Sequence, residues 1–279
     1  MEVDEKTIAV LEEKAWHLRE KIIRMIGAAG SGHPGGSLSA VEIVTALYFH
    51  LMNHDPKNPD WPERDRFVLC KGHAAPVLYA ALAEAGYFDP SELDGLRKFG
   101  SILQGHPDRK KTPGVEVSTG SLGQGLSIAN GIALAGKLDG SDWRVFALLG
   151  DGEIQEGQVW EAAMTAAHRS LDNLVAYVDN NNLQIDGDIR NVKGLDNIPA
   201  RWEAFGWHVQ EIDGHDLAAI IEATEKALAT KGKPSVIVCR TVKGKGVSFM
   251  ENQAGWHGKA PNKEQVAEAL KQLAQRRDG

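Results

Sequence analysis

Apolar, strand-like runs alternate with helix-patterned stretches through the second half of this chain, and this alternation constrains the fold more than any other feature. The strand-like runs are WRVFALLG (143–150), LVAYVDNNN (174–182), WHVQEID (207–213) and SVIVCRT (235–241), with helical patterns at 156–170 and 215–232. Strands that alternate with helices form βαβ units, whose strands run parallel. The sequence therefore predicts an α/β fold with a doubly wound, mainly parallel sheet and helices on both faces.

The rest of the chain extends this pattern without a clear boundary. Residues Thr7–Ala29 carry apolar side chains spaced by three and four, which predicts a helix, and RFVLC (66–70) predicts a short buried strand. We find no repeat, low-complexity segment or linker, so we expect one domain over residues 1–279. Within it we expect an irregular glycine-rich segment at 241–260 and a C-terminal helix at 262–276.

Composition excludes several classes of protein. The formal net charge is −7, and no run of Lys and Arg suggests a nucleic-acid partner. The charged, helical start is not typical of a signal or transit peptide, and no apolar run reaches the ~18 residues of a membrane span. The two cysteines, Cys70 and Cys239, each end an apolar run, which favours buried free thiols. We therefore expect a cytoplasmic enzyme or binding protein with no membrane partner.

Two polar segments follow strand-like runs: Gly150-Asp151-Gly152, and the asparagines 180–182. A βαβ crossover returns the chain to the same edge of the sheet, so the two segments should be neighbours there, where ligands of such sheets bind. Carboxylate and amide oxygens suit Mg²⁺ or Ca²⁺, and a glycine turn before a helix suits a phosphate. The pair predicts a diphosphate held through a divalent cation. A helix cap and a turn are the plain alternative.

Other nucleotide and metal motifs are absent from the sequence. It contains no G-x-x-x-x-G-K-[ST] and no H-E-x-x-H, and the glycines 120, 123 and 125 stand in the wrong order for a dinucleotide fingerprint.

Four histidines stand in glycine-rich or turn-like contexts: His33, His73, His106 and His257. Each alone would be an ordinary surface or packing residue. Together they suggest a polyhydroxylated substrate, because imidazoles bond hydroxyls and carbonyls and transfer protons near pH 7.

Five motifs then give a more specific indication. In chain order they are SGHPGGSLS (31–39), KGHA (71–74), GHP (105–107), STGSLGQG (118–125) and GDGEIQEG (150–157). Over about residues 8–260 the chain resembles the transketolases, thiamine diphosphate enzymes that transfer two-carbon ketol units between sugars. The GDG motif with its asparagines is shared by other thiamine diphosphate enzymes, whereas the histidine loops are more specific.

The resemblance implies roles for the matching residues around the cofactor. Asp151 and Asn181 match the metal's side-chain ligands, and the backbone carbonyl of Leu183 matches the third ligand. His73 and Gly152 match positions near the diphosphate.

It also implies roles toward the rest of the cofactor and the sugar. Gly120 and Leu122 match positions along the aminopyrimidine and the bridge. Glu156 matches a glutamate that communicates with the catalytic glutamate across the subunit interface. The residues that match the histidines bonding the donor ketose and assisting proton transfer are His33, His106 and His257.

One departure from the family is large. A full transketolase continues for over three hundred residues, with a pyrimidine-binding domain that carries the activating glutamate. The resemblance therefore implies the N-terminal subunit of a split transketolase, which works with a C-terminal subunit on sugar phosphates, in an expected heterotetramer. The polar helical end resembles a natural terminus. The alternatives are a non-catalytic cofactor-binding module, or a subunit of another thiamine diphosphate enzyme of the decarboxylase, dehydrogenase or deoxyxylulose-phosphate synthase type.

Overall fold

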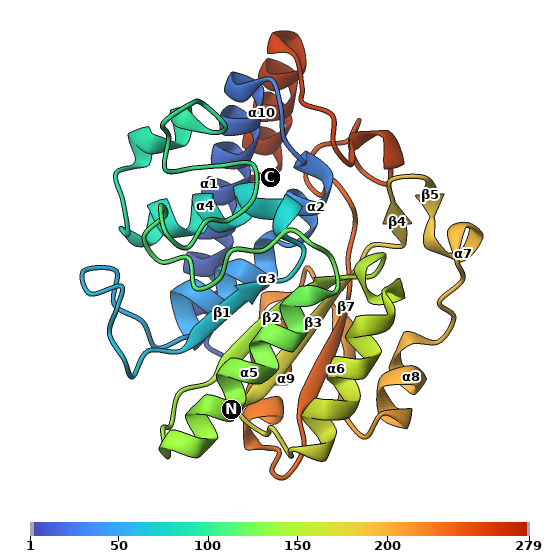
Figure 1. The fold of residues 1–279 in the computed structure, drawn as a ribbon. Helices are drawn as coiled ribbons and strands as arrows, with labels where there is room; N and C mark the ends of the chain where they lie inside the picture. Colours follow the sequence, from blue (N-terminus) through green and yellow to red (C-terminus); the bar gives the residue numbers. More distant parts are fainter. Residues whose placement is uncertain (1–2, 278–279) are drawn as a thin grey trace.

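A five-stranded sheet forms the centre of the molecule (Figure 1). The computed structural model describes residues 3–277. The strand order is β1-β2-β3-β7-β6, and every neighbouring pair in this sheet is parallel. The bounds are β1 Arg66–Leu69, β2 Val145–Gly150, β3 Leu174–Asn180, β6 His208–Asp213 and β7 Ser235–Arg240. This confirms the predicted α/β fold.

Alternate residues of each strand enter two separate apolar cores, because successive side chains point to opposite faces of a sheet. In β2, Phe146 and Leu148 belong to one core, and Val145, Ala147 and Leu149 belong to the other. The central strands β2, β3 and β7 are therefore apolar through most of their length, as expected where helices cover both faces, whereas the edge strand β6 is largely polar.

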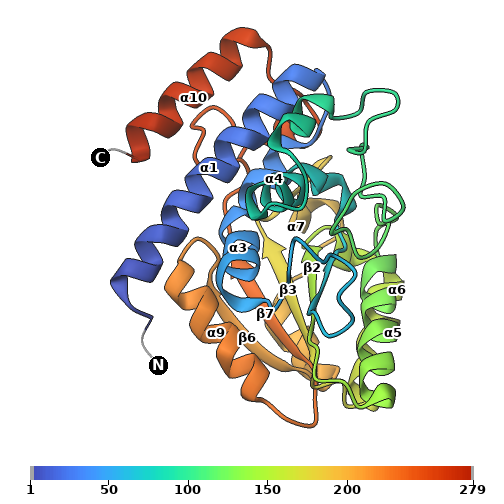
Figure 2. The same ribbon diagram turned by 90° about the vertical axis from the view of Figure 1, so that its left-hand side faces the viewer.

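Helices cover the two faces as distinct layers (Figure 2). The first layer holds α1 Glu5–Ala29, α3 Val41–Ala46, α4 Ala75–Ala85 and α9 Leu217–Ala229. The second holds α5 Gln124–Asp139, α6 Gly157–His168 and α8 Ile198–Ala204. The last helix, α10 Lys263–Arg277, packs along α1. The sheet is thus enclosed on both faces, as in a doubly wound fold.

Short elements complete the chain and lie mostly around one end of the sheet. They are α2 Pro34–Ser39, α7 Ile189–Val192, the antiparallel pair β4 Leu183–Gln184 and β5 Gly187–Asp188, and the single turns η2 Gly72–Ala74, η4 Glu153–Gln155 and η5 Ala254–Trp256. A π-helical turn, η1 Leu47–Leu51, extends α3, and η3 Pro90–Gly95 follows α4.

The longest helix begins and ends at residues suited to those positions. The Asp4 carboxylate accepts a 2.9 Å hydrogen bond from the Thr7 amide, and Gly30 ends α1 with a φ of 61°. Cys70 and Cys239 are buried free thiols, which confirms that prediction. Within residues 3–277, no helix has the length and apolar character needed to span a membrane.

Candidate functional site

A cavity of about 300 Å³ opens at the carboxyl ends of the strands. Of the residues predicted to hold a metal and a diphosphate, the cavity is lined by Gly150, Asp151, Gly152, Asn181, Leu183 and His73. Of those predicted to face the rest of the cofactor and the sugar, it is lined by Leu122, Glu156 and His257. The sheet topology explains this gathering, because the chain leaves four adjacent parallel strands at the same edge.

The two polar segments are neighbours, as their spacing predicts. β2 pairs with β3, and Gly150 stands opposite Asp179 in the register. The Asp151 amide donates to the Asp179 carbonyl at 3.3 Å, and the Asn182 amide donates to the Asp151 carboxylate. One strand–helix–strand circuit therefore unites the Gly-Asp-Gly and asparagine segments.

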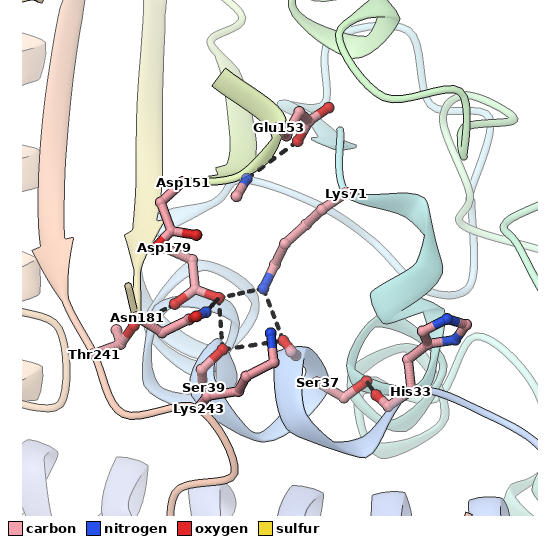
Figure 3. A network of polar contacts seen from close by, with 12 residues as sticks. His33, Ser37, Ser39, Lys71, Asp151, Glu153, Asp179, Asn181, Thr241 and Lys243 are labelled. Atoms are coloured by element: carbon pink, nitrogen blue, oxygen red, sulfur yellow. Dashed lines mark hydrogen bonds and ion pairs between the residues drawn. The ribbon is translucent and has the colours of Figure 1, made fainter. Parts of the chain in front are cut away.

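Asp179 lies at the centre of a buried polar network (Figure 3). Its carboxylate accepts hydrogen bonds from Lys71, Ser39, Thr241 and Asn181. Burial by itself would raise the pKa of Asp179, but the Lys71 charge and the bonds from its neighbours outweigh burial and lower it. Asp179 is therefore an ionised carboxylate whose bonding capacity is filled.

Asp151 is also buried, but among the described residues its carboxylate accepts hydrogen bonds only from backbone amides. Gly152 donates to one oxygen at 2.8 Å, and Asn182 donates to the other. Burial raises the pKa of Asp151 to about 7, and the charge of Asp179 adds to this effect. Asn181 and Leu183 line the same cavity; the Asn181 amide oxygen accepts from the Leu183 amide at 3.1 Å, and the Leu183 carbonyl oxygen accepts from Lys243 at 3.0 Å. These oxygens are the hard donors that suit a divalent cation.

Lys243 enters the cavity from the segment after β7. Its ammonium donates to the Leu183 carbonyl at 3.0 Å. Burial lowers the pKa of Lys243 to about 8, although the Asp151 charge opposes the shift. Lys71, which also donates to the Gly36 carbonyl at 2.7 Å, is the second buried ammonium here. The cavity thus offers positive charge to an anion beside its oxygen donors.

Glu153 joins the glycine turn before α5 to the end of β2. One oxygen accepts from the Gly123 amide and the other from the Gly150 amide, each at 3.1 Å. Burial raises the pKa of Glu153 to about 7 despite these bonds. Its role in the site is to fix two loops relative to each other.

Three of the four histidines form a cluster. The ring centroids of His33, His73 and His257 lie 5.0–5.5 Å apart in every pairing. Burial is the largest cause that lowers their pKa values, to about 4, about 2 and about 3; the Arg97 charge adds to it at His33, and lysine charges add to it at His73 and His257. The Nδ1 atoms of His33 and His257 are buried without a hydrogen-bond partner among the described residues. The cluster therefore presents neutral imidazoles with free bonding capacity.

His106 makes no ring contact with that cluster among the described residues, although its charge acts on His33. It packs against Gly120, whose φ of 139° suits glycine, and a Cβ at Gly120 would lie 2.5 Å from His106 Cδ2. On the other side, a Cβ at Gly72 would lie 2.7 Å from the Gly120 amide nitrogen. His106 is among the exposed residues, but its ring is partly desolvated, and this partial burial and the Arg97 charge lower its pKa. Gly120 and His106 thus pack together next to Gly72 of the KGHA motif, and neither residue lines the cavity.

Comparison with known proteins identifies the family. The family model described as "Transketolase, thiamine diphosphate binding domain" matches residues 12–277. The chain belongs to the transketolase family. It is 48% identical to the 6-deoxy-6-sulfo-D-fructose transketolase subunit SqwG of Clostridium sp. (strain MSTE9), over 94% of this chain and 96% of that protein. It is 42% identical to an apulose-4-phosphate transketolase subunit of Phocaeicola vulgatus, over 96% of this chain and 95% of that protein.

Solved transketolase structures share the fold. The Campylobacter jejuni transketolase superposes with a TM-score of 0.90 and 35% identity, covering 98% of this chain but 43% of that one. Human transketolase is 43% identical over 97% of this chain and 43% of its own length. This transketolase chain therefore matches subunits along almost their whole length, and about two fifths of the single-chain enzymes.

Several residues of this transketolase site were not identified from sequence: Ser39, Lys71, Glu153, Asp179, Thr241 and Lys243. Position alone offered a signal for five of them. Three stand in quoted motifs: Ser39 in SGHPGGSLS, Lys71 in KGHA and Glu153 in GDGEIQEG. Asp179 directly precedes the asparagines, and Lys243 follows a strand end in TVKGKG.

Among residues 3–277, no group of three or more His, Cys, Asp and Glu side chains is placed to hold a metal ion. The predicted metal ligands are of another kind, since they combine one carboxylate with an amide and a carbonyl oxygen. Their role in this transketolase chain stays a prediction.

Proposed function

We propose that this chain is the N-terminal subunit of a split transketolase. With a partner subunit it transfers a two-carbon ketol unit from a ketose phosphate to an aldose phosphate. The observation that carries the proposal is a single cavity that brings the oxygen donors Asp151, Asn181 and Leu183 together with His73 and His257. Cofactor binding alone would not require a histidine cluster beside the cation donors.

The residues fit thiamine diphosphate with Mg²⁺ or Ca²⁺. The carboxylate of Asp151 has no cationic side chain bonded to it among the described residues, while Asn181 and Leu183 add neutral oxygens. A Cβ at Gly152 would lie 2.9 Å from the Gln184 amide oxygen and 3.1 Å from Gln184 Cβ, so glycine lets the turn pack closely against Gln184. We propose that Asp151, Asn181 and the Leu183 carbonyl hold the cation, with Lys243 and His73 beside the diphosphate.

When bound, thiamine diphosphate supplies the carbon nucleophile that cleaves the ketose. The chain's own residues bind and orient the sugar around it. His33 and His257 are neutral and carry free buried Nδ1 atoms, so each can bond a hydroxyl or carbonyl of the donor and hold or accept a proton there. His106, which packs against Gly120, is proposed to bond the sugar from the mouth of the site.

A second chain is needed in this proposal. We propose that a C-terminal subunit with the pyrimidine-binding domain completes the site, in a heterotetramer of two copies of each chain. The exposed Glu156 lies at the cavity and is proposed to face the activating glutamate of that subunit. We treat residues 1–279 as one diphosphate-binding domain. Because sugar phosphates are intracellular metabolites, we propose the cytoplasm as the compartment.

The direct test is an assay of the purified chain with thiamine diphosphate and Mg²⁺, alone and with its partner subunit. We expect turnover of xylulose 5-phosphate with an aldose phosphate only when both chains are present. Full turnover by this chain alone would reject the split-subunit proposal. Conversion of pyruvate in place of the ketose would assign the pair to another thiamine diphosphate reaction.

His106→Ala tests the donor site. Because His106 lies outside the cavity that we assign to the cofactor, the variant should lower kcat/KM for the ketose about a hundred-fold, with cofactor affinity within about two-fold. The exposed His168 on α6 supplies the matched control, His168→Ala, which should leave both quantities unchanged. A loss of cofactor affinity without loss of turnover at saturation would remove His106 from the donor site.

A further inference from the structure

The segment 241–245, which delivers Lys243 to the cavity, is fixed by backbone hydrogen bonds to three parts of the molecule. The Thr241 amide donates to the Asn180 carbonyl at 3.1 Å, and the Gly244 amide donates to the Gly35 carbonyl at 3.0 Å. Between them, the Val242 amide donates to His215 Nε2 at 2.8 Å. Among the described residues, His215 is the one side chain that accepts from a backbone amide of this segment.

This geometry fixes the tautomer of His215. Because Nε2 accepts a hydrogen bond, it carries no proton, so the proton of the neutral ring lies on Nδ1. Nδ1 stands 2.9 Å from the Glu42 carboxylate and donates to it. A carboxylate that orients an imidazole through Nδ1 fixes which nitrogen is left to accept. His215 thus presents an oriented acceptor to Val242.

Glu42 is in turn fixed by Arg19. The Arg19 guanidinium donates to the other Glu42 oxygen at 2.5 Å, and both side chains are buried. Burial alone would raise the pKa of Glu42, but Arg19 and His215 outweigh burial and lower it. Arg19 Nε also donates to the Lys245 carbonyl at 3.3 Å. The three side chains therefore bond the segment on both sides of Lys243, at Val242 and at Lys245.

Lys243 itself has little freedom once the segment is fixed. A Cβ at Gly35 would lie 3.0 Å from Lys243 Cγ, so the lysine stem packs closely against α2. Its side chain is 2% exposed, and its ammonium donates to Leu183. A displacement of the segment would therefore move the ammonium out of its place among the cation donors.

We infer that Arg19, Glu42 and His215 form a buried positioning chain for Lys243, running from α1 through α3 and the loop after β6 to the segment after β7. Within the described part of the chain, none of the three residues lines the cofactor cavity or hydrogen-bonds to a cation donor or to the histidine cluster. They set cofactor affinity by holding Lys243 where the diphosphate and cation bind. This inference rests on the proposed function, because in that function the Lys243 ammonium lies beside the diphosphate of the cofactor.

A double-mutant cycle on the full-length chain tests it, with thiamine diphosphate titrated calorimetrically in the presence of Mg²⁺. His215→Phe leaves the Val242 amide unpaired and should weaken binding roughly ten-fold. In the Lys243→Met background, the same change should weaken binding less than about two-fold, since the group being positioned is gone. His215→Gln, which keeps an acceptor, should recover most of the affinity. His208→Phe, at the opposite end of β6, is the matched control.

Equal ten-fold losses in both backgrounds, or no loss in the wild-type background, would overturn the inference. An ester in place of the Val242 amide removes only the donor, and it serves if His215→Phe fails to fold. That ester should weaken cofactor binding ten-fold, and His215→Gln added to it should cause no further loss of affinity. An ester with wild-type affinity would contradict the inference.

Hydrogen–deuterium exchange separates this inference from the proposed function. In the cofactor-free chain, His215→Phe should speed exchange of the Val242 amide, and unchanged exchange would overturn the positioning role. If the wild-type chain and its complex with the partner both fail to bind thiamine diphosphate, the proposed function fails, whatever the exchange result.

Discussion

The carboxyl ends of β2 and β3 each carry a buried aspartate, and the molecule treats the two in opposite ways. Asp179, on β3, accepts four side-chain hydrogen bonds, one from an ammonium. Asp151, after β2, accepts only from two backbone amides among the described residues. The pKa of Asp179 is lowered, because the Lys71 charge and the donated bonds outweigh burial, and that of Asp151 is raised chiefly by burial. A carboxylate whose oxygens are bonded to several side chains holds the structure together. A carboxylate with no side-chain donor has oxygens available to a ligand.

The donors to Asp179 come from four places in the chain: after β1, in α2, after β3 and after β7. Asp179 therefore ties together the loops that form the cavity. Asp151 receives its bonds from its own turn and from the next strand's loop, so it holds less of the structure together.

The largest effect should follow from Asp179→Ala. The variant leaves the Lys71 ammonium buried without its counter-ion, which we expect to cost about 3–5 kcal/mol of unfolding free energy. Urea unfolding measures this loss. The double variant Lys71→Met/Asp179→Leu should regain most of it, because an apolar pair does not need compensation. A loss below about 1 kcal/mol would contradict the view of Asp179 as structural.

Asp151→Asn should separate stability from binding. The amide keeps the shape of the side chain, but its NH2 group cannot accept the hydrogen bond that one carboxylate oxygen accepts from Gly152 or Asn182. The unfolding free energy without ligand should therefore fall by about 1–3 kcal/mol, less than in Asp179→Ala. Binding of thiamine diphosphate that depends on Mg²⁺ should be lost in calorimetric titration, and Asn181→Ala should share that loss. Asp139→Asn, at the exposed end of α5, is the matched control. Wild-type affinity in Asp151→Asn would reject the metal site.

The sequence predicts the surroundings of Asp151 but not those of Asp179, because the first depend on the local chain path and the second on the order of the strands. The position of Asp151 beside the asparagines could be predicted, because a βαβ crossover places adjacent strand ends together whatever the rest of the fold does. The network around Asp179 could not, since it depends on the strand order. Lys243 approaches because β7 pairs with β3, although about sixty residues separate them. Periodicity predicts parallel strands but not which ones are neighbours.

The histidines show a second limit of the same kind. His33, His73 and His257 share a glycine-rich context with His106, and nothing in that context separates the four. The rings of the first three meet, because the fold brings together the loop before α2, the turn after β1 and the segment after η5, while His106 packs against Gly120. Likewise nothing in the sequence around His215 indicates its contacts with Glu42 and Val242, because they come from elements far apart in the chain.

Glu84, a partly buried carboxylate outside the site, shows how cationic partners alone change the pKa of a carboxyl group. Glu84 on α4 accepts from Lys14 and Lys21 of α1, each at 2.5 Å. Burial opposes the shift, but the two lysines lower the pKa of Glu84 from 4.5 to about 2. The carboxylate therefore binds its proton less readily in the folded chain than in the unfolded one. Its contribution to stability is complete above about pH 4.5 and is lost as the pH falls toward 2.

Glu84→Gln should therefore lower the unfolding free energy by about 1 kcal/mol or less at pH 7, because solvent screens a pair so near the surface. The difference from wild type should shrink between pH 4.5 and pH 3 in urea unfolding curves. Glu161→Gln, on the exposed face of α6, gives the baseline for removing one charge. A loss at pH 7 as large as that of Asp179→Ala would mean that cationic partners alone, and not their burial, distinguish Asp179 from Asp151. A difference that stayed constant with pH would show that the Glu84 contacts stabilise the chain by packing instead of charge.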